Sequence, residues 1–289
     1  MQKLFVILQY LIPQHGLSRL VAIFANSQLD FIKAPFIRFF IKRYQVNMDE
    51  AKITEVAQFS SFNDFFTREL KDNAREVVQD HDAIVSPADG AISELGPIEN
   101  DSLLQAKGRY YSAVDLLGGR PEDTEPFRDG SFITIYLSPR DYHRVHMPLP
   151  GKLLKTVYVP GKLFSVNQTT ANSVPRLFAR NERLVCFFET EIGPMAMVLV
   201  GAMIVAGIET VWAGRACPNN HDLLTTHYTD HAPPIQLSKG SEMGRFCLGS
   251  TVILLFGPGA ININSQLDSG CSIKLGELLA RANNNTDET

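Results

Sequence analysis

Residues 132–137 read Phe-Ile-Thr-Ile-Tyr-Leu, a short run of β-branched and aromatic residues that is typical of a buried strand. Three similar runs follow it along the chain: Leu153 to Val159, Leu184 to Phe188 and Met197 to Val205. From about Ala83 onward, such runs are short and are separated by Gly and Pro. This pattern predicts an antiparallel β core rather than alternating strand and helix units.

The first 44 residues are helical and apolar in character. Pro13, Gly16 and Pro35 divide them into two or three short helices. Up to Asn47 the chain carries six basic residues and one acidic residue, a net charge of +5. Because the net charge of the whole chain is −4, the remainder carries −9. A basic, apolar segment on an acidic body favours an anionic lipid surface over nucleic acid as its partner, so we expect no nucleic-acid binding.

Other interpretations of this segment remain open. Residues 4–12 have the apolarity of a secretory signal, but no small-residue cleavage site follows them. A spanning helix needs about 18 predominantly apolar residues, and Gln9, Pro13 and Arg19 interrupt any such run. The segment could also be a helical cap folded onto its own protein core, because apolar helix faces are usually buried there.

Between the N-terminal helices and the β core, Ser61-Phe-Asn-Asp64 has the form of a capping box that opens a helix over Phe62 to Leu70. Its three phenylalanines, Phe62, Phe65 and Phe66, are expected to pack inward. The fold class is therefore expected to be α+β, with a helical N-terminal membrane-associating cap on a mostly antiparallel β core. We divide the chain into a region 1–58 and a domain 59–289.

The strongest local signal is the stretch 239–256, Lys-Gly-Ser-Glu-Met-Gly-Arg-Phe-Cys-Leu-Gly-Ser-Thr-Val-Ile-Leu-Leu-Phe. A Gly-Ser-Thr step at 249–251 interrupts what otherwise reads as consecutive strands. Taken alone, Gly-Ser pairs are common turn chemistry and indicate only a tight bend.

In its wider context the stretch 239–251 resembles the processing segment of the bacterial phosphatidylserine decarboxylases. Four further stretches resemble that family in the same order along the chain: Phe65 to Leu70, Ser86 to Gly90, Leu137 to Pro148 and Val159 to Asn167. Together they span most of the chain, from about Phe59 to Gly276.

The resemblance implies a self-processing enzyme that converts phosphatidylserine to phosphatidylethanolamine and carbon dioxide. Its cofactor would be a pyruvoyl group made from Ser250. The serine hydroxyl would attack the carbonyl of Gly249, and cleavage between residues 249 and 250 would leave a large β chain and a small α chain that stay together. Glycine before the serine keeps that carbonyl sterically open. No phosphate-cradling Gly-rich loop of the dinucleotide-binding or P-loop type is apparent, which agrees with a cofactor made from the chain itself.

A serine hydroxyl is a poor nucleophile near neutral pH, so a histidine base and an orienting carboxylate are expected beside it. By resemblance, His146 is the base and Asp89 its orienting carboxylate, whereas His143 donates a proton to the decarboxylated substrate. The resemblance also suggests that Ser165 and Asn167 line the head-group pocket. Outside the resemblance, the Asp-Gly step at 89–90 indicates only a turn.

The two histidines also permit an interpretation from local sequence. Ser138-Pro-Arg-Asp141 has the order of an N-cap, a first-turn proline and an acid, which predicts a short helix over Pro139 to Met147 that Pro148 ends. In a helix His143 and His146 would share one face, whereas in a strand they would face opposite ways. Solvated surface histidines and a metal pair are the alternatives, but no third ligand lies nearby in sequence.

A second cluster of metal-ligand types departs from the family pattern: Cys217, His221, His227 and His231. Thiolate and imidazole groups at short intervals can close a zinc site. The two prolines at 233–234 suit a variable surface loop better. We therefore assign no metal to the chain and keep a zinc site as the alternative.

The expected location is the cytoplasmic side of the inner membrane, as a peripheral protein. The four widely spaced cysteines do not form a disulfide pattern and suit a reducing compartment. The resemblance further implies a dimer of α and β chain pairs. Two other classes stay open: a pyruvoyl decarboxylase of a soluble amino acid, which would not need the basic apolar N-terminus, and a non-catalytic β module, which would show no chain break.

Overall fold

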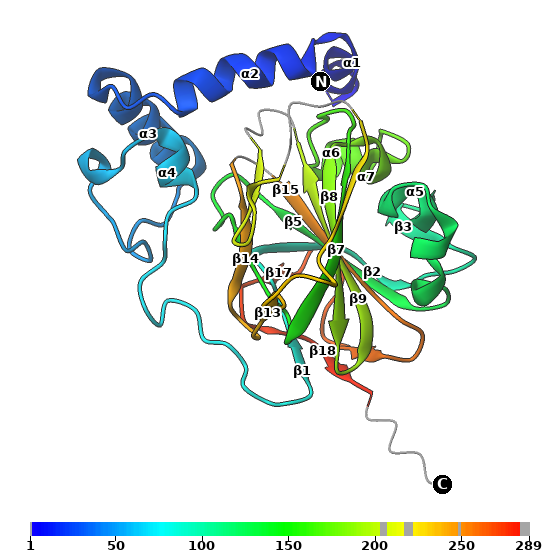
Figure 1. The fold of residues 1–289 in the computed structure, drawn as a ribbon. Coiled ribbons are helices and arrows are strands. Elements are labelled where there is room, and N and C mark those ends of the chain that lie inside the picture. The colour runs from blue at the N-terminus through cyan, green and yellow to red at the C-terminus, as the bar shows by residue number, and fades with distance from the viewer. Residues whose placement is uncertain (1, 203–206, 217–221, 248–249, 284–289) are drawn as a thin grey trace, which may run out of the picture.

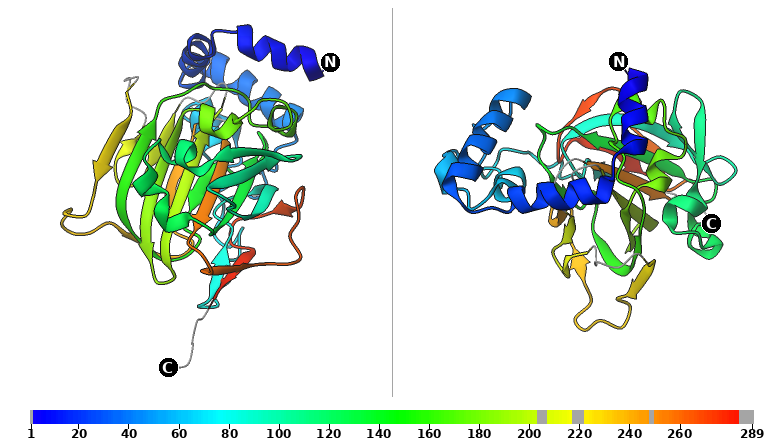
Figure 2. Two further views of the ribbon diagram at one scale, coloured as in Figure 1. Left: turned by 90° about the vertical axis from the view of Figure 1, so that its right-hand side faces the viewer. Right: turned by 90° about the horizontal axis from the view of Figure 1, so that it is seen from above.

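The computed structural model describes residues 2–202, 207–216, 222–247 and 250–283. Its N-terminal helices lie across one end of a β-rich core, as Figure 1 and both views of Figure 2 show. The helices before the core are α1 Gln2–Leu11, α2 Gln14–Ala25, α3 Asp30–Tyr44, the 3-10 turn η1 Val56–Gln58 and α4 Phe62–Phe66.

A large antiparallel sheet forms the centre of the molecule. Its strand order is β12-β7-β8-β9-β15-β5-β2-β17, and β13 also pairs with β7. In that order the strands are β12 Leu224–His227, β7 Gly151–Val159, β8 Arg183–Thr190, β9 Gly193–Gly201, β15 Ser250–Phe256, β5 Ser131–Leu137, β2 Gly90–Pro97 and β17 Ser272–Ile273, with β13 Gln236–Leu237. The α+β class and the antiparallel core expected from the sequence are confirmed.

Smaller elements complete the core. A four-stranded sheet in the order β11-β10-β14-β6 contains β11 Gly214–Arg215, β10 Ile208–Thr210, β14 Glu242–Phe246 and β6 Arg144–His146. Two further sheets contain β1 Ala83–Val85, β18 Leu278–Ala282 and β16 Ile261–Ile263, and the pair β3 Ser102–Ala106 and β4 Arg109–Ser112. The remaining helical turns are α5 Ala113–Leu117, η2 Pro121–Asp123, η3 Glu125–Phe127, α6 Gln168–Ala171 and α7 Leu177–Arg180.

Strand β15 lies in the interior of the large sheet. All seven of its residues are buried, and each pairs with β5 on one side and β9 on the other. Alternate side chains enter two different hydrophobic clusters, with Val252 and Leu254 in one and Ile253 and Leu255 in the other. Because side chains of a strand alternate between its faces, Ser250 points to the same face as Val252 and Leu254. That cluster also contains Val145 of β6 and Phe246 of β14.

A third hydrophobic cluster joins the N-terminal helices to α4. It includes Ile37 and Phe40 of α3 and the three fully buried phenylalanines of α4, Phe62, Phe65 and Phe66. The expected N-cap is present, since the Ser61 hydroxyl accepts a hydrogen bond from the Asp64 N–H at 3.1 Å. The helix ends at Phe66 rather than at Leu70 as expected.

No single described helix is both long and apolar enough to cross a bilayer; α2 and α3 reach that length and composition only as a pair, across a bend of 111°. The N-terminal helices are nevertheless strongly apolar on their exposed side. Thirteen of the seventeen exposed large hydrophobic side chains in the described chain lie between Leu4 and Tyr44.

Candidate active site

Ser250 is the first residue of β15, and its side chain is completely buried. Its backbone pairs with Leu137 at the end of β5 and with Gly201 at the end of β9. The Ser250 hydroxyl oxygen has no hydrogen-bond partner among the described residues. A buried hydroxyl without a partner carries a desolvation cost, which points to a role in chemistry rather than in stability. Gly249, the predicted acyl donor, lies outside the described residues.

His143 is also completely buried, and its ring contacts that of Phe66 in a tilted arrangement, with the ring centroids 4.0 Å apart. Its Nδ1 lies 2.8 Å from the Asp141 carbonyl oxygen, and its Nε2 has no partner in the described chain. Since a carbonyl oxygen can only accept, Nδ1 carries the proton and Nε2 presents a lone pair. Burial lowers the pKa of His143 to about 3, so the ring is neutral at pH 7.

His146 is the last residue of β6 and is held at both ring nitrogens. Its Nδ1 donates to the Gly240 carbonyl oxygen at 2.8 Å, and its Nε2 lies 3.1 Å from the Tyr142 hydroxyl, which acts as the donor. Burial lowers the pKa of His146, against an opposing contribution from the Gly240 hydrogen bond. The imidazole is therefore a neutral base whose lone pair Tyr142 occupies.

The helix expected over residues 139–147 does not form. Residues 144–146 instead make the strand β6, which pairs with β14, and the Phe246 N–H donates to the His143 carbonyl oxygen at 3.0 Å. Pairing with a segment about 100 residues later overrides the local helix signal. The two histidines are three residues apart in extended chain, so the expectation that they share a helix face is wrong.

Asp89 lies at the turn before β2 and is bound by Arg75. Arg75 Nε lies 2.9 Å from Oδ1 and Nη2 lies 2.5 Å from Oδ2, and the Leu275 N–H donates to Oδ1 at 2.9 Å. Glu50 shares the same guanidinium at 2.6 Å. Gly90 is required next to this carboxylate, because a Cβ there would lie 2.3 Å from the Tyr136 carbonyl oxygen.

The backbone brings the predicted residues close together without joining their side chains. The His146 N–H donates to the Pro87 carbonyl oxygen at 2.8 Å, two residues before Asp89. Two short stretches of chain connect His143 to Ser250. Leu137, six residues before His143, pairs with Ser250, and Phe246, four residues before Ser250, donates its N–H to the His143 carbonyl oxygen. No hydrogen bond joins the side chains of Asp89, His146 and Ser250 in the described structure, so the three form a cluster rather than an assembled triad.

Three residues around this cluster were not anticipated from the sequence: Arg75, Tyr142 and Arg68. Arg68 is 5% exposed, and its Nη2 donates to the Arg140 carbonyl oxygen at 3.1 Å. Its Nε and Nη1 have no partner among the described residues. The one available signal was proximity in sequence, since Arg68 lies in the stretch 65–70 that resembles the family and Tyr142 lies between the quoted aspartate and histidine.

Ser165 and Asn167, the predicted head-group residues, have structural roles. The Ser165 N–H donates to Gln9 Oε1 of α1 at 2.8 Å. Asn167 is the N-cap of α6, where its Oδ1 accepts from the Thr170 N–H at 3.1 Å. Like Gln9, Gln14 of α2 accepts a backbone hydrogen bond: its Oε1 lies 2.7 Å from the Leu163 N–H nitrogen. Two buried glutamines thus fix the N-terminal helices to this segment, and the head-group role remains a prediction.

Two of the four residues considered as zinc ligands, Cys217 and His221, lie outside the described residues. His231 Nδ1 lies 2.7 Å from the Pro233 carbonyl oxygen, and His227 ends β12 at the surface. Across the described ranges, no group of three or more His, Cys, Asp or Glu side chains is arranged to hold a metal ion.

Comparisons with known proteins identify the family of the chain. A family model described as phosphatidylserine decarboxylase matches residues 62–281, and a second model, described as PSD, matches residues 4–45. The chain is 56% identical to a phosphatidylserine decarboxylase proenzyme of Pseudomonas fluorescens Pf-5 over 277 residues, and this covers 96% of each chain.

Two further relatives carry the same name. A proenzyme of Pseudomonas aeruginosa PAO1 is 56% identical over 279 residues, with 96% of each chain covered. Another, of Pseudomonas fluorescens Pf0-1, is 54% identical over 283 residues, with 98% of this chain and 99% of the relative covered. The chain therefore belongs to the phosphatidylserine decarboxylase family, a family of enzymes.

Proposed function

We propose that this chain is a membrane-associated decarboxylase that converts phosphatidylserine to phosphatidylethanolamine and carbon dioxide, with a pyruvoyl group formed from Ser250. The single observation that carries the proposal is the Ser250 hydroxyl, which is buried at the start of a central strand without a partner among the described residues. The relatives, whose printed names call them proenzymes of this activity, support the substrate and the self-processing.

In the processing reaction, Ser250 Oγ attacks the Gly249 carbonyl carbon and the Gly249–Ser250 amide becomes an ester. Elimination then releases the Gly249 carboxylate and leaves a dehydroalanine at position 250, and its hydrolysis releases ammonia. The pyruvoyl group supplies an electron sink for the electrons left behind by carbon dioxide.

The residues of the cluster serve this chemistry as bases and orienting groups. His146 is the base for Ser250, because its Nδ1–H is fixed on Gly240 and its Nε2 carries the lone pair. For His146 to act, Tyr142 must release that nitrogen. Asp89 stabilises the imidazolium that then forms. His143 protonates the decarboxylated carbon, after its Nε2 has first accepted a proton, because the ring is neutral near pH 7.

The N-terminal helices support association with a membrane surface. Leu11 of α1, Ile23 of α2 and Phe31 of α3 are 74%, 69% and 76% exposed, and an accumulation of exposed large apolar side chains in one region indicates an interaction surface. The net charge of +5 up to Asn47 adds attraction to anionic lipid. We place the chain as a peripheral protein on the cytoplasmic side of the inner membrane. The dimer of chain pairs rests on the family resemblance alone, and light scattering of the purified enzyme tests it.

Mass spectrometry of the purified protein tests the proposal. We expect two chains with a break before Ser250, a small chain with a blocked N-terminus, and carbon dioxide release from phosphatidylserine. Ser250→Ala should stay full length, whereas Ser241→Ala, a matched change in the same stretch, should be cleaved normally. An intact wild-type chain would contradict the proposal and favour a non-catalytic module. Cleaved protein that acts on free amino acids but not on lipid would favour a soluble-substrate decarboxylase.

A further inference from the structure

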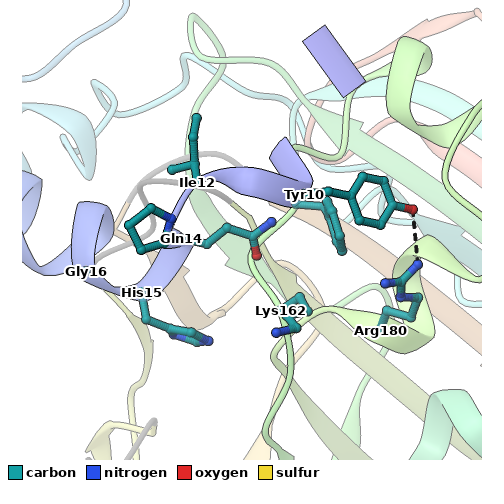
Figure 3. Close-up of a pocket in the computed structure, with 9 residues that line it drawn as sticks. Tyr10, Ile12, Gln14, His15, Gly16, Lys162 and Arg180 are labelled. Atoms are coloured by element: carbon teal, nitrogen blue, oxygen red, sulfur yellow. Dashed lines mark hydrogen bonds between the residues drawn. The ribbon is translucent and has the colours of Figure 1, made fainter. Parts of the chain in front are cut away.

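A cavity of about 380 Å3 lies where the turn between α1 and α2 meets the β core, away from the residues assigned to catalysis above. From the helices it is lined by Tyr10 and by residues 12–16. From the core it is lined by Lys162, Phe164 and Arg180 (Figure 3). The cavity therefore opens at the boundary between the exposed apolar helices and the catalytic domain.

The cavity is basic and contains no carboxylate. Lys162, Arg180 and His15 line it, and no Asp or Glu does. Neither Lys162 nor Arg180 forms an ion pair with a described residue, whereas Arg75, Arg144 and Arg281 all do. Glu182, whose N–H donates to the Lys162 carbonyl oxygen, does not pair with either cation. Two cations brought together without a counter-charge favour binding of an anion.

The fold brings these two cations together through a close backbone contact. The Lys162 N–H donates to the Arg180 carbonyl oxygen at 2.8 Å, and residue 162 forms a parallel bridge with Asn181. Gly161 permits this approach, because a Cβ there would lie 2.5 Å from the same carbonyl oxygen. The relative position of the two backbone segments that carry these side chains is thus set before any ligand arrives.

The Arg180 side chain is also held in place. Its guanidinium lies 5.0 Å from the ring centroid of Phe164 and 5.5 Å from that of Tyr10, and Nη1 donates to the Tyr10 hydroxyl at 3.2 Å. Figure 3 shows Lys162 and Arg180 on the core side of the cavity, opposite the turn that carries Gln14 and His15. Arg180 keeps further N–H donors for a ligand, because only Nη1 is used by Tyr10.

Neighbours of the lining residues link the cavity to the exposed apolar helices on one side and, through the sheet, to Ser250 on the other. On one side, Leu11 is next to the lining residues and is 74% exposed. On the other side, Asn181, adjacent to Arg180, donates from Nδ2 to the Gly201 carbonyl oxygen at 2.9 Å. Gly201 in turn pairs with Ser250 across the sheet. A lipid whose acyl chains contact the helices would therefore have its phosphate near Lys162 and its head group toward Ser250.

From this arrangement we infer that the cavity binds the phosphodiester group of the glycerophospholipid substrate, with Lys162 and Arg180 as its ligands. This inference rests on the proposed decarboxylation of phosphatidylserine. The phosphodiester is the part of the molecule that substrate and product share, so these residues bind the lipid without contributing to the chemical step.

Kinetics with soluble dihexanoyl phosphatidylserine test the inference. Lys162→Gln and Arg180→Gln should each raise KM by about tenfold or more and change kcat by less than about threefold, because each removes one charge-assisted hydrogen bond. Arg109→Gln, at an exposed site on β4, is the control and should leave both constants unchanged. Dihexanoyl phosphatidylglycerol should inhibit the wild-type enzyme competitively and inhibit both variants less.

The other outcomes overturn the inference in distinguishable ways. If the variants keep the wild-type KM but bind phosphatidylglycerol vesicles less tightly, the cavity holds a separate membrane lipid rather than the substrate. If neither KM nor vesicle binding changes, the cavity is not a phosphodiester site. Both variants should still yield two chains by mass spectrometry, and a wild-type chain that does not cleave would count against the proposed function instead.

Discussion

Arg75 binds both carboxylate oxygens of Asp89, with Nε 2.9 Å from Oδ1 and Nη2 2.5 Å from Oδ2. Both side chains are largely buried, at 8% and 10% exposure. The carboxylate expected to orient His146 is thus held by a cation, and a direct hydrogen bond from the imidazole would require its Nδ1–H to leave the Gly240 carbonyl oxygen. In the structure Asp89 acts on His146 through its charge, which opposes the lowering of the pKa of His146.

The first prediction concerns this ion pair. Asp89→Asn should slow self-cleavage, because the imidazolium formed at His146 loses its counter-charge. It should also lower the free energy of unfolding by about 3 kcal/mol, since it leaves the buried Arg75 with Glu50 alone. A time course of cleavage and urea denaturation measure the two effects. Glu122→Gln, which breaks the exposed ion pair with Arg120, is the control, and equal losses in both variants would contradict this prediction.

The second prediction separates the two histidines by stage. His146→Ala should accumulate as uncleaved chain, since loss of a general base costs on the order of 10²–10⁴ in rate. His143→Ala should cleave normally but turn over poorly, because its proton transfer is needed only after the cofactor exists. Gel analysis and carbon dioxide release distinguish the stages. His143 Nε2 has no partner among the described residues, so His143 could itself serve as the base. An uncleaved His143→Ala together with a cleaved and active His146→Ala would show that the two roles are reversed.

The third prediction concerns stability and pH. The pKa of His143 is about 3 in the folded protein, below its ordinary value near 6.5. Between these values the unfolded chain binds a proton that the folded chain does not. Stability from this group is therefore complete above about pH 6.5 and declines as the pH falls toward 3, by at most about 1.4 kcal/mol per pH unit.

Urea denaturation between pH 7 and pH 4 measures this decline. The Ser250→Ala background keeps the chain in one piece, so that unfolding involves a single molecule. Adding His143→Gln should make the decline shallower. Adding His81→Gln should not, because the His81 side chain is 90% exposed. Parallel pH profiles for both double variants would show that His143 is not the titrating group.

The fourth prediction concerns the exposed apolar helices. Replacing Leu11, Ile23 and Phe31 together by serine should weaken vesicle binding by at least about tenfold per residue, since burying each such side chain contributes about 1.5–3 kcal/mol. Binding should also favour anionic vesicles and weaken as salt rises. Co-sedimentation measures both effects. Tyr110→Ser, a change at another exposed apolar residue, should bind like the wild type. Unchanged binding of the triple variant would locate the membrane contact elsewhere.

The sequence predicted the elements that depend on local pattern. The runs at 132–137 and 184–188 lie within β5 and β8, because strands that are covered on both faces are buried almost continuously and consist of apolar and β-branched residues. The helix signal at Ser138-Pro139 was wrong, since β14 supplies strand pairing that no local pattern reveals. Among candidate site residues, Ser250 and His143 were predicted from the family stretches, and the structure shows that both are buried.

Long-range contacts between polar side chains were beyond the reach of the sequence. Arg75 lies in a polar segment with no periodicity, so nothing indicates that it reaches Asp89. Gln9 gave a weaker but usable signal, because a glutamine inside an apolar helix is costly to bury unless it has a hydrogen-bond partner. From the sequence, Gln9 was interpreted only as a break in an apolar run. The structure shows that Gln9 and Gln14 attach the helices to residues 163–165.

The position of β15 has a further consequence for the mature enzyme. With the proposed cleavage before Ser250, the small chain would begin with the interior strand that pairs along its whole length with β5 and β9. Unfolding of the precursor involves one molecule, but unfolding of the mature enzyme is also a dissociation. Its melting temperature should therefore rise with protein concentration, and refolding should be second order in the two chains. Maturation thus converts the fold into an assembly governed by mass action.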